Sequence, residues 1–452
     1  MEKPNKILPS KNSENKILLA LELLDKNNLE DQLTSLHPAD FSDQFEQLTS
    51  EQRESLIQSA PKLISADVLA ELEDEIVEDI LPLLPSRKLA SAITELDNDD
   101  ATQIIEEMEE AQREEVFKAL EPYERATIEA SLRFDEETIG RLMQREFVAA
   151  PPFWTVGDTI DHMREDGREL PDLFFNIWVI DTHFMPIGYV PLSTIMKSSR
   201  DVSLNDIMNR SIVKITQSMD QEEAAYLFEK YNLISAPVVD DDERLAGIMT
   251  VDDIIEIIQN ENKEDILALA GVSEASLTDT AVDIVKARAP WLFINLATSI
   301  LASIVIAQFD YAITQIVALA ILMPIVASMG GNAGTQALTV AVRNLTEKDL
   351  TSQTAWRSVQ REAIAAMIIG FIFAFSLALI SYIWFQDLKL SVVAFVAMII
   401  NHIFAGLAGI LVPLGFKKFG ADPAVSSSVF VTTVTDIVGF FVFLGLAVFI
   451  LL

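Results

Sequence analysis

The chain has 452 residues, 50% of them hydrophobic, and a formal net charge of −35 at pH 7. Seven basic and seven acidic residues balance over positions 290–452, so the whole negative excess falls on positions 1–289. The absence of cysteine excludes disulfides and thiolate metal sites, and the acidic excess disfavours nucleic acid and favours metal cations as partners.

Residues 1–136 predict an acidic all-α domain. Between positions 16 and 133, leucines recur at helical spacing, and short helices are expected to begin at signals such as His37-Pro38, Ser65 and Asp97. Loosely repeated helical pairs of this length favour a superhelical or solenoid-like stack. Most of the interleaved Asp and Glu side chains should form a solvated face.

Residues 137–260 predict two α/β units in tandem, at about 137–200 and 201–260. In the first, a helix at 158–164 precedes strands at 175–181 and 186–190. In the second, a helix at 221–230 precedes strands at 236–240 and 245–250, and a further helix starts at position 251. This order is characteristic of a CBS-domain pair.

The second unit fits the CBS signature at Gly247, Thr250 and Asp253, whereas the first keeps Gly188 and lacks the hydroxyl and the acid that should come after it. In CBS proteins that bind adenosine nucleotides, such a threonine and aspartate approach phosphate and ribose. Thr250 and Asp253 are therefore the candidates for binding ATP. The alternative is a purely structural pair.

Residues 252–285 predict a helix that connects the second CBS unit to the membrane. Six acidic residues punctuate its first half, several at i, i+3 or i+4 spacing, where like charges repel. A cation between this helix and another acidic surface would relieve the repulsion. Mg²⁺ suits such a site because it is a hard ion that prefers carboxylates and keeps several waters.

Residues 286–452 predict a membrane domain of five transmembrane helices, near 290–309, 311–341, 363–385, 390–414 and 424–452. The polar start of the chain has no signal-peptide core, so we expect the acidic part to be cytoplasmic. Eight of the nine basic residues that flank the spans then lie in cytoplasmic loops, with Lys389 as the exception, and the C-terminus is extracytoplasmic.

The second span contains Gly330, Gly331 and Gly334, which weaken a helix. Irregular backbone at membrane depth is tolerated where it is buried in protein or lines a wet cavity. Asn332 and Gln336 in the same stretch favour a pore. The alternative is close helix–helix packing through small residues.

The fifth span holds a single carboxylate, Asp436, fourteen residues and about 21 Å after Asp422. An ionisable residue at that depth is a functional-site hypothesis, with a protonated structural Asp as the alternative. Asp422 before Pro423 is typical of a helix N-cap, which we favour over a direct role at the pore mouth. In the fourth span, His402 is expected to form a hydrogen bond between helices rather than to bind a metal.

This order of parts resembles the MgtE family of magnesium channels, over essentially the whole chain. Residues 330–336 resemble the glycine-rich segment of the family's second span. Asp422-Pro423 and residues 435–439 resemble its fifth span, with Asp436 at the position of the pore carboxylate. Residues 264–266, followed by Gly271, are similar to the end of the family's plug helix. The resemblance implies a homodimer in the lipid bilayer of the cell membrane.

The resemblance and the charge together predict a Mg²⁺-selective uptake channel that is not an enzyme. Two Asp436 carboxylates would recognise a hydrated ion at the two-fold axis, and spans two and five would line the path through Gly330, Gly331, Asn332, Gly334, Gln336, Ser428, Thr432 and Thr435. Cytosolic Mg²⁺ would close the channel by bridging the acidic domains. The expected ligands are Asp253, Glu256, Glu264 and Asp265, with Asp422 as a further candidate and Asp97, Asp99 or Asp100 facing the connecting helix.

Two other classes stay open. One is an ion-coupled exchanger or exporter of Mg²⁺ or Co²⁺, in which Asp436 would carry a proton or sodium. The other is a membrane-anchored sensor of Mg²⁺ or nucleotide. Co²⁺ and Mn²⁺ stay open as cargo, because sites built only from oxygen ligands discriminate by size and geometry.

Overall fold

The computed structural model describes residues 36–165, 170–171, 173–272, 281–346, 352–419, 422–423 and 427–452, together with Ile17 and Leu33. The chain forms two compact units, Met1–Gln259 and Asn260–Leu452. The helices expected before position 36, and the start of the fifth span at 424–426, lie outside the described residues.

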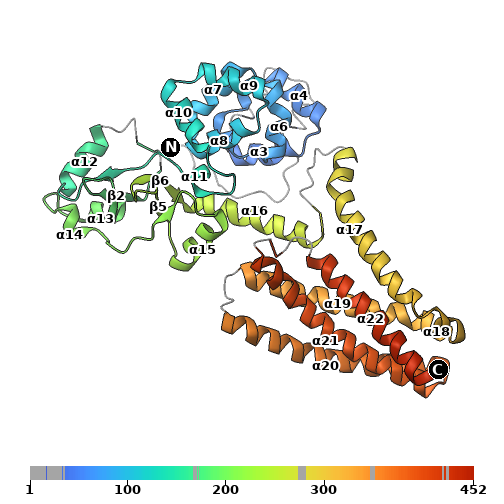
Figure 1. Cartoon of the computed structure of the whole chain (residues 1–452). Coiled ribbons are helices and arrows are strands. Elements are labelled where there is room, and N and C mark those ends of the chain that lie inside the picture. The colour runs from blue at the N-terminus through green and yellow to red at the C-terminus, as the bar shows by residue number, and fades with distance from the viewer. Residues whose placement is uncertain are drawn as a thin grey trace, which may run out of the picture. The chain divides into compact units, whose positions relative to one another are not determined.

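The N-terminal part is an all-helical domain with one hydrophobic core, as predicted. Its helices begin at local capping signals. The His37 ring accepts a hydrogen bond from the Ala39 amide, and the Ser65 hydroxyl accepts one from the Val68 amide. The helices, shown in blue to cyan in Figure 1, are α3 (Pro38–Glu46), α4 (Ser50–Ser59), η1 (Pro61–Leu63), α5 (Ala66–Ala70), α6 (Asp74–Ile80), η2 (Leu81–Leu83), α7 (Ser86–Glu95), α8 (Asn98–Glu106), α9 (Glu110–Ala119) and α10 (Pro122–Ser131).

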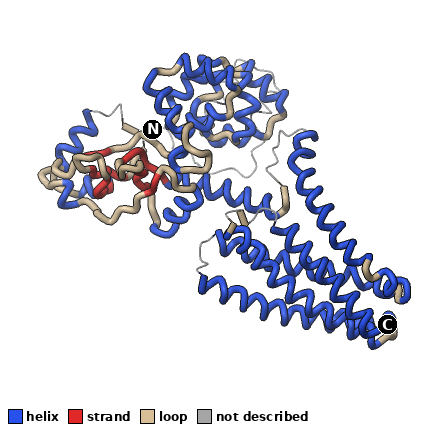
Figure 2. Tube along the Cα trace, in the orientation of Figure 1, coloured by secondary structure: helices blue, strands red, loops and turns tan. Residues whose placement is uncertain are grey.

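Two three-stranded sheets come next, and Figure 2 shows the described strands confined to this region. In each sheet a short first strand runs parallel to the second, which pairs antiparallel with the third. The predicted tandem CBS order is confirmed. Its elements are α11 (Ile139–Leu142), β1 (Ala149–Ala150), α12 (Val156–Glu165), β2 (Asn176–Ile180), β3 (Pro186–Pro191), α13 (Leu192–Lys197), α14 (Leu204–Ile207), β4 (Ile215–Thr216), α15 (Gln221–Tyr231), β5 (Ser235–Val239), β6 (Leu245–Thr250) and α16 (Val251–Leu269).

The glycine of the CBS signature is required for the same structural reason in both units. Gly188 lies opposite Val179, and Gly247 lies opposite Val238, in equivalent registers of the two sheets. A Cβ atom on Gly188 would lie 2.9 Å from the Asn209 carbonyl oxygen, and one on Gly247 would lie 2.6 Å from the Gln144 carbonyl oxygen. In each unit a neighbouring backbone segment crosses the third strand too closely for any side chain.

The described residues of the second unit contain five helices that are long and apolar enough to span a membrane, which agrees with the predicted number. Helix α21 is central and packs against α19, α20 and α22, while α22 also contacts α17 and α19. The helices, yellow to red in Figure 1, are α17 (Ala281–Ala307), α18 (Asp310–Gln315), α19 (Ala318–Thr346), α20 (Ser352–Phe385), α21 (Leu388–Lys418) and α22 (Ser427–Leu451).

One expectation about the spans is wrong. The glycine-rich stretch is not irregular, because α19 is helical throughout from Ala318 to Thr346. A Cβ atom on Gly330 would overlap the Asn401 amide, so this glycine serves close packing between helices. The described part of α22 begins at Ser427, so the expected N-cap role of Asp422 stays a prediction.

Candidate ion pathway and acidic cluster

Helices α19 and α22 meet along a surface of small and hydroxylated residues. A Cβ atom on Gly331 would lie 3.8 Å from both Thr432 Cγ2 and Thr435 Oγ1, and one on Gly334 would lie 3.5 Å from Thr435 Cγ2. The structure therefore brings together four of the predicted pathway residues. We call this surface the α19–α22 seam.

The hydroxyl groups of α22 are oriented by their own helix. Thr432 Oγ1 donates to the Ser428 carbonyl oxygen at 3.0 Å, and Thr435 Oγ1 donates to the Thr432 carbonyl oxygen at 2.9 Å. A hydroxyl that donates its proton to the backbone keeps its lone pairs for another donor or a cation. The seam therefore presents oxygen acceptors at membrane depth.

Asp436 follows Thr435 in α22, nine residues or about 14 Å from the start of that helix. Its side chain is half-buried. Within the described residues, no hydrogen bond or ion pair engages this carboxylate. Both of its oxygens are therefore available to a ligand.

The other predicted pathway residues lie elsewhere on the bundle. Gly330 packs against Asn401 rather than against α22, whereas Asn332 and Gln336 are exposed on α19. Ser428 is half-buried near the start of α22. Asp422 is exposed in the segment before that helix.

The fourth span supplies a buried polar junction, but through Asn401 rather than His402. The Asn401 Nδ2 atom donates to the Val326 carbonyl oxygen of α19 at 2.9 Å. His402 Nδ1 instead lies 3.0 Å from the Met398 carbonyl oxygen of its own helix, so its expected hydrogen bond between helices is wrong. Its ring stacks on Phe373 of α20.

In the first unit, the start of α16 faces the acidic start of α8. Burial raises the pKa of Asp99 well above its ordinary value, and the charges of Asp253, Asp100 and Asp97 raise it further. Burial also raises the pKa of Asp100 to about 7, with Asp97, Asp253 and Glu256 contributing. The predicted facing of the connecting helix by this acidic turn is present in the structure.

Two further acids belong to this group, and the sequence analysis missed both. Loss of surrounding water raises the pKa of Glu256, and the charges of Asp74 and Glu71 add to the shift. Glu71 precedes α6 and Asp74 begins it, and nothing in their local sequence distinguishes them from the solvated acids of the same domain. We call the group the acidic cluster; it consists of Glu71, Asp74, Asp97, Asp99, Asp100, Asp253 and Glu256.

The acidic cluster has one buried oxygen without a partner. Asp99 Oδ1 is buried and accepts no hydrogen bond from the described residues. An unsatisfied buried acceptor is costly, and more so when it carries charge. As the side chains stand, no three His, Asp or Glu residues in the described part of the chain are arranged to hold a metal ion.

Thr250 and Asp253, the candidate nucleotide ligands, are already bonded to protein groups. Thr250 Oγ1 donates to Asp253 Oδ2 at 2.7 Å, and Gln144 Nε2 donates to the same oxygen at 3.2 Å. Burial raises the pKa of Asp253 to about 6. The hydrogen bonds that the hydroxyl and the backbone N–H of Thr250 donate to this carboxylate oppose the shift.

Glu264 and Asp265 lie further along α16, in the second unit. One turn after them, Ala268 and Leu269 pack against a small hydrophobic cluster. That cluster includes Leu338 and Val342 of α19, Ala408 of α21 and Val431 of α22. The end of α16 thus contacts the α19 and α22 helices that form the seam.

A helical acidic domain, a CBS pair and a five-helix membrane bundle that carries the unengaged carboxylate of Asp436 define a membrane transporter for cations. Residues 323–446 match the MgtE model, described as a divalent cation transporter; residues 36–137 match the MgtE intracellular N domain; and residues 204–260 match a CBS domain. The chain belongs to the MgtE family of magnesium transporters.

Relatives match along nearly the whole chain. The chain is 30% identical to the magnesium transporter MgtE of Thermus thermophilus, over 95% of this chain and 96% of the relative. It is 28% identical to the Bacillus subtilis protein of the same name, over 92% of each. Among solved structures, the cytosolic domain of the Mg²⁺ channel MgtE in complex with ATP has a TM-score of 0.50 and 30% identity, and it covers 53% of this chain and 98% of that chain.

Proposed function

We propose that the chain forms a Mg²⁺-selective channel that mediates magnesium uptake and is closed by cytosolic Mg²⁺. The observation that supports transport is the α19–α22 seam together with Asp436, which follows the seam residue Thr435 in α22 and whose carboxylate no hydrogen bond or ion pair of the described residues engages. The role is passage of an ion rather than catalysis. The α/β and N-terminal domains are cytoplasmic, and with five spans the C-terminus lies outside the cell membrane.

A homodimer completes the selective site in this proposal. One carboxylate has too little charge to hold a divalent ion, whereas a two-fold axis along α22 would supply two Asp436 side chains. Because Mg²⁺ dehydrates reluctantly, the pair would bind an ion that keeps most of its waters. Gly330, Gly331, Asn332, Gly334, Gln336, Ser428, Thr432 and Thr435 would surround the path, with Asp422 at its cytoplasmic mouth.

Gating would operate through the acidic cluster. Without Mg²⁺, carboxylates with raised pKa values repel one another, and Asp99 holds an unpartnered buried oxygen. A Mg²⁺ ion bound between α8 and α16 would neutralise this repulsion and give the buried Asp99 oxygen a partner. Its ligands would be Asp99 or Asp100 of α8 and Asp253 or Glu256 of α16. It therefore binds the compact form better and favours closure. Glu264 and Asp265 would bind Mg²⁺ near the end of α16 that packs on the seam helices.

ATP is not part of this proposal, although the solved relative was crystallised with it. The sequence points to Thr250 and Asp253 as its ligands, but Gln144 occupies the Asp253 carboxylate, which also belongs to the acidic cluster. We therefore assign Asp253 to Mg²⁺ sensing rather than to ATP binding. Co²⁺ and Mn²⁺ are alternative cargoes to be separated by competition.

The test is Mg²⁺ flux into liposomes that contain the purified protein, recorded also as single-channel current. Stepwise current that needs no counter-ion gradient supports a channel. Flux that requires a proton or sodium gradient identifies an exchanger instead, and an absence of flux with retained Mg²⁺ binding identifies a sensor. Competition by Co²⁺ and Mn²⁺ in the same liposomes reports the selectivity.

A further inference from the structure

The α11 segment, which we define as residues 139–145, is anchored in the second CBS unit. Ile139 and Met143 are 0% exposed and belong to the hydrophobic core of that unit. Gln144 exchanges two backbone hydrogen bonds with Ile248 of β6, at 2.8 and 2.9 Å. Because the apolar residues four apart fix one side of the segment in the core, its polar side chains are left to bond to other elements.

Arg141 joins this segment to the end of α8. Its guanidinium group forms an ion pair with Glu106, the last residue of α8, and donates from Nη1 to the carbonyl oxygens of Leu132 and Phe134 at 3.1 Å. Arg141 is 8% exposed. Charge-assisted bonds from which water is largely excluded are strong, and the loss of one partner is costly.

Arg145 joins the same segment to the start of α8. Its Nε and Nη2 atoms donate to the Ser131 hydroxyl oxygen at 3.3 and 3.4 Å, and Asn98 Nδ2 donates to the same oxygen at 3.0 Å. Ser131 is 0% exposed and Asn98 is 5% exposed. Asn98 is the first residue of α8 and is followed by Asp99 and Asp100 of the acidic cluster. The buried serine therefore ties these two carboxylates to Arg145.

The segment also bonds to the opposite side of the acidic cluster. Between the two arginines, Gln144 Nε2 donates to Asp253 Oδ2 of α16 at 3.2 Å. Residues 141–145 thus bond to both ends of α8 and to the carboxylate of α16 that faces it. The charge of Asp253 raises the pKa of Asp99, which shows that the carboxylates brought together in this way repel one another. The bonds of the segment oppose that repulsion.

We propose that Arg141 and Arg145 are positioning residues for Mg²⁺ sensing, which hold α8 against α16 despite the repulsion within the acidic cluster. This role rests on the proposed gating by cytosolic Mg²⁺. The bonds set the fraction of molecules in which α8 already faces α16 before an ion binds. The apparent Mg²⁺ affinity rises with that fraction, because only this compact form presents ligands from both helices.

The first experiment measures the compact form in the purified full-length protein. The chain has no cysteine, so spin labels can be placed at Asp67→Cys on α5 and Glu229→Cys on α15, both exposed. Dilution with unlabelled protein confines the measured distances to one chain. In chelator, Arg145→Met and Arg141→Met should each reduce the compact population at least about threefold relative to the labelled chain without them.

A Mg²⁺ titration of the same distance separates positioning from charge. Arg145→Met removes a positive charge beside the start of α8, so an effect of charge alone would lower the Mg²⁺ concentration at half-maximal compaction. Loss of positioning should instead raise that concentration at least about threefold, while saturating Mg²⁺ restores the compact population. Arg125→Met is the control, because Arg125 is exposed on α10 and pairs with Glu129 of its own helix, and it should not raise the midpoint.

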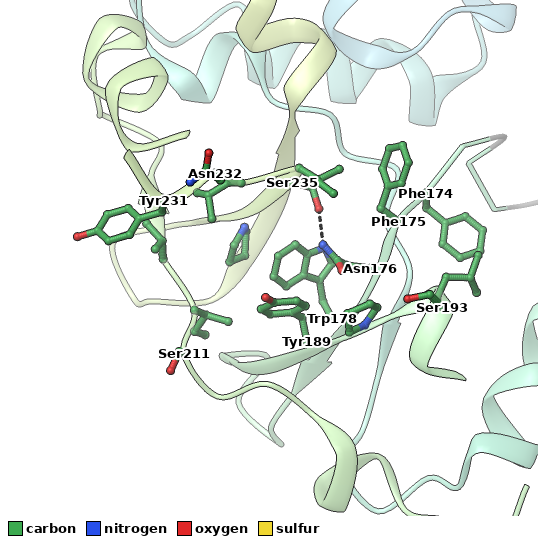
Figure 3. Close-up of a pocket in the computed structure, with 17 residues that line it drawn as sticks. Phe174, Phe175, Asn176, Trp178, Tyr189, Ser193, Ser211, Tyr231, Asn232 and Ser235 are labelled. Carbon is green, nitrogen blue, oxygen red and sulfur yellow. Dashed lines mark hydrogen bonds between the residues drawn. The ribbon is translucent and has the colours of Figure 1, made fainter. Parts of the chain in front are cut away.

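Ser131→Ala tests the same link without a change of charge and decides the matter if an arginine variant fails to fold. It removes the oxygen that Asn98 and Arg145 share, and it should shift both readouts in the same direction by about twofold or more. Its control is Asn176→Ala, which removes the bond that Asn176 donates to Ser235 at 2.8 Å between the two CBS units (Figure 3) and should change neither readout.

The outcomes separate this role from the gating on which it rests. A native chain whose distances do not respond to Mg²⁺ contradicts the proposed gating itself. A native chain that responds, with folded Arg145→Met and Ser131→Ala variants that match it in chelator or show a lower Mg²⁺ midpoint, overturns the positioning role alone.

Discussion

The Asn401 amide of α21 donates a hydrogen bond to the Val326 carbonyl oxygen of α19, and two glycines make room for it. One is Gly330 of α19, and the other is Gly439 of α22, where an added Cβ atom would lie 2.9 Å from Asn401 Nδ2. A single buried polar side chain thus joins three membrane helices. It sets how closely α19 and α22 can approach, and with that the geometry of the seam.

Replacing either partner in this junction should destabilise the membrane domain. Asn401→Ala removes the hydrogen bond and leaves a space, which we expect to cost about 2–4 kcal/mol. Gly330→Ala overpacks the same spot, at about 1–3 kcal/mol. Thermal unfolding in detergent measures both effects.

The double variant Gly330→Ala/Asn401→Ala provides the sharper test of this junction. The added methyl group should occupy part of the space left by the amide, so the double variant should be less destabilised than the sum of the singles. Gly415→Ala is the control, because nothing lies within 4 Å of the added atom. Additive losses would show that Asn401 and Gly330 do not act as a unit.

Asp436→Asn should abolish Mg²⁺ flux while the protein stays folded. The amide keeps the size of the side chain but removes the charge that attracts a divalent ion, and no described partner is lost. Flux into liposomes should fall at least about a hundredfold, with an unchanged unfolding temperature. Asp310→Asn, in the first turn of α18, is the matched control and should conduct normally. Native flux in the Asp436 variant would remove this residue from the pathway.

The variant Asp99→Asn/Asp253→Asn should uncouple the cytosolic domains from Mg²⁺. It removes the repulsion between α8 and α16 and the unpartnered charge on Asp99. The domains should resist protease without added Mg²⁺, and the protection gained on adding Mg²⁺ should shrink severalfold. Asp67→Asn changes an exposed acid of α5 and serves as the control. Undiminished Mg²⁺-dependent protection would argue against the acidic cluster as the sensor.

The acidic cluster should also make stability fall as pH rises. Four of its carboxylates, those of Asp99, Asp100, Asp253 and Glu256, have higher pKa values in the folded state than in the unfolded chain, reaching about 7 for Asp100 and about 6 for Asp253. The folded state therefore binds more protons between about pH 4 and those values, and its stability declines across that window as pH increases. In chelator, the cytosolic unit should unfold at a lower temperature at about pH 8 than at about pH 5.5.

Saturating Mg²⁺ should flatten this pH profile, because the ion replaces the protons as the source of positive charge. The apparent Mg²⁺ affinity should decrease as pH falls below about 7, since protons and ions compete for the same carboxylates. Thermal unfolding at several Mg²⁺ concentrations measures both trends. A profile that slopes equally with and without Mg²⁺ would contradict the assignment.

The sequence predicted the features that depend on local pattern. The five apolar spans, the tandem CBS order and the helix starts at His37 and Ser65 all result from hydrophobic period and capping chemistry. Prediction from the sequence was less reliable where the local structure depends on contact with a neighbouring helix. Gly330 weakens an isolated helix, yet α19 stays regular because the Asn401 side chain fills the space that the glycine leaves.

The acidic cluster was predictable only where its residues form a local sequence pattern. The acids at the start of α16 stand out because they repel one another along one helix, and the acidic turn at the start of α8 stands out as a dense charge run. Glu71 and Asp74 are distant from α16 in the sequence, and only tertiary packing brings their charges near Glu256.

Equivalent registers at Gly188 and Gly247 show that the two CBS units are built on one structural pattern. They differ at the positions that come after this glycine: the later unit has Thr250 and Asp253, and the earlier unit has Pro191 and Thr194. The charged position of this pattern is thus confined to the later unit, where Asp253 belongs to the acidic cluster. A substitution that follows Gly188 should therefore leave the charge of the acidic cluster unchanged.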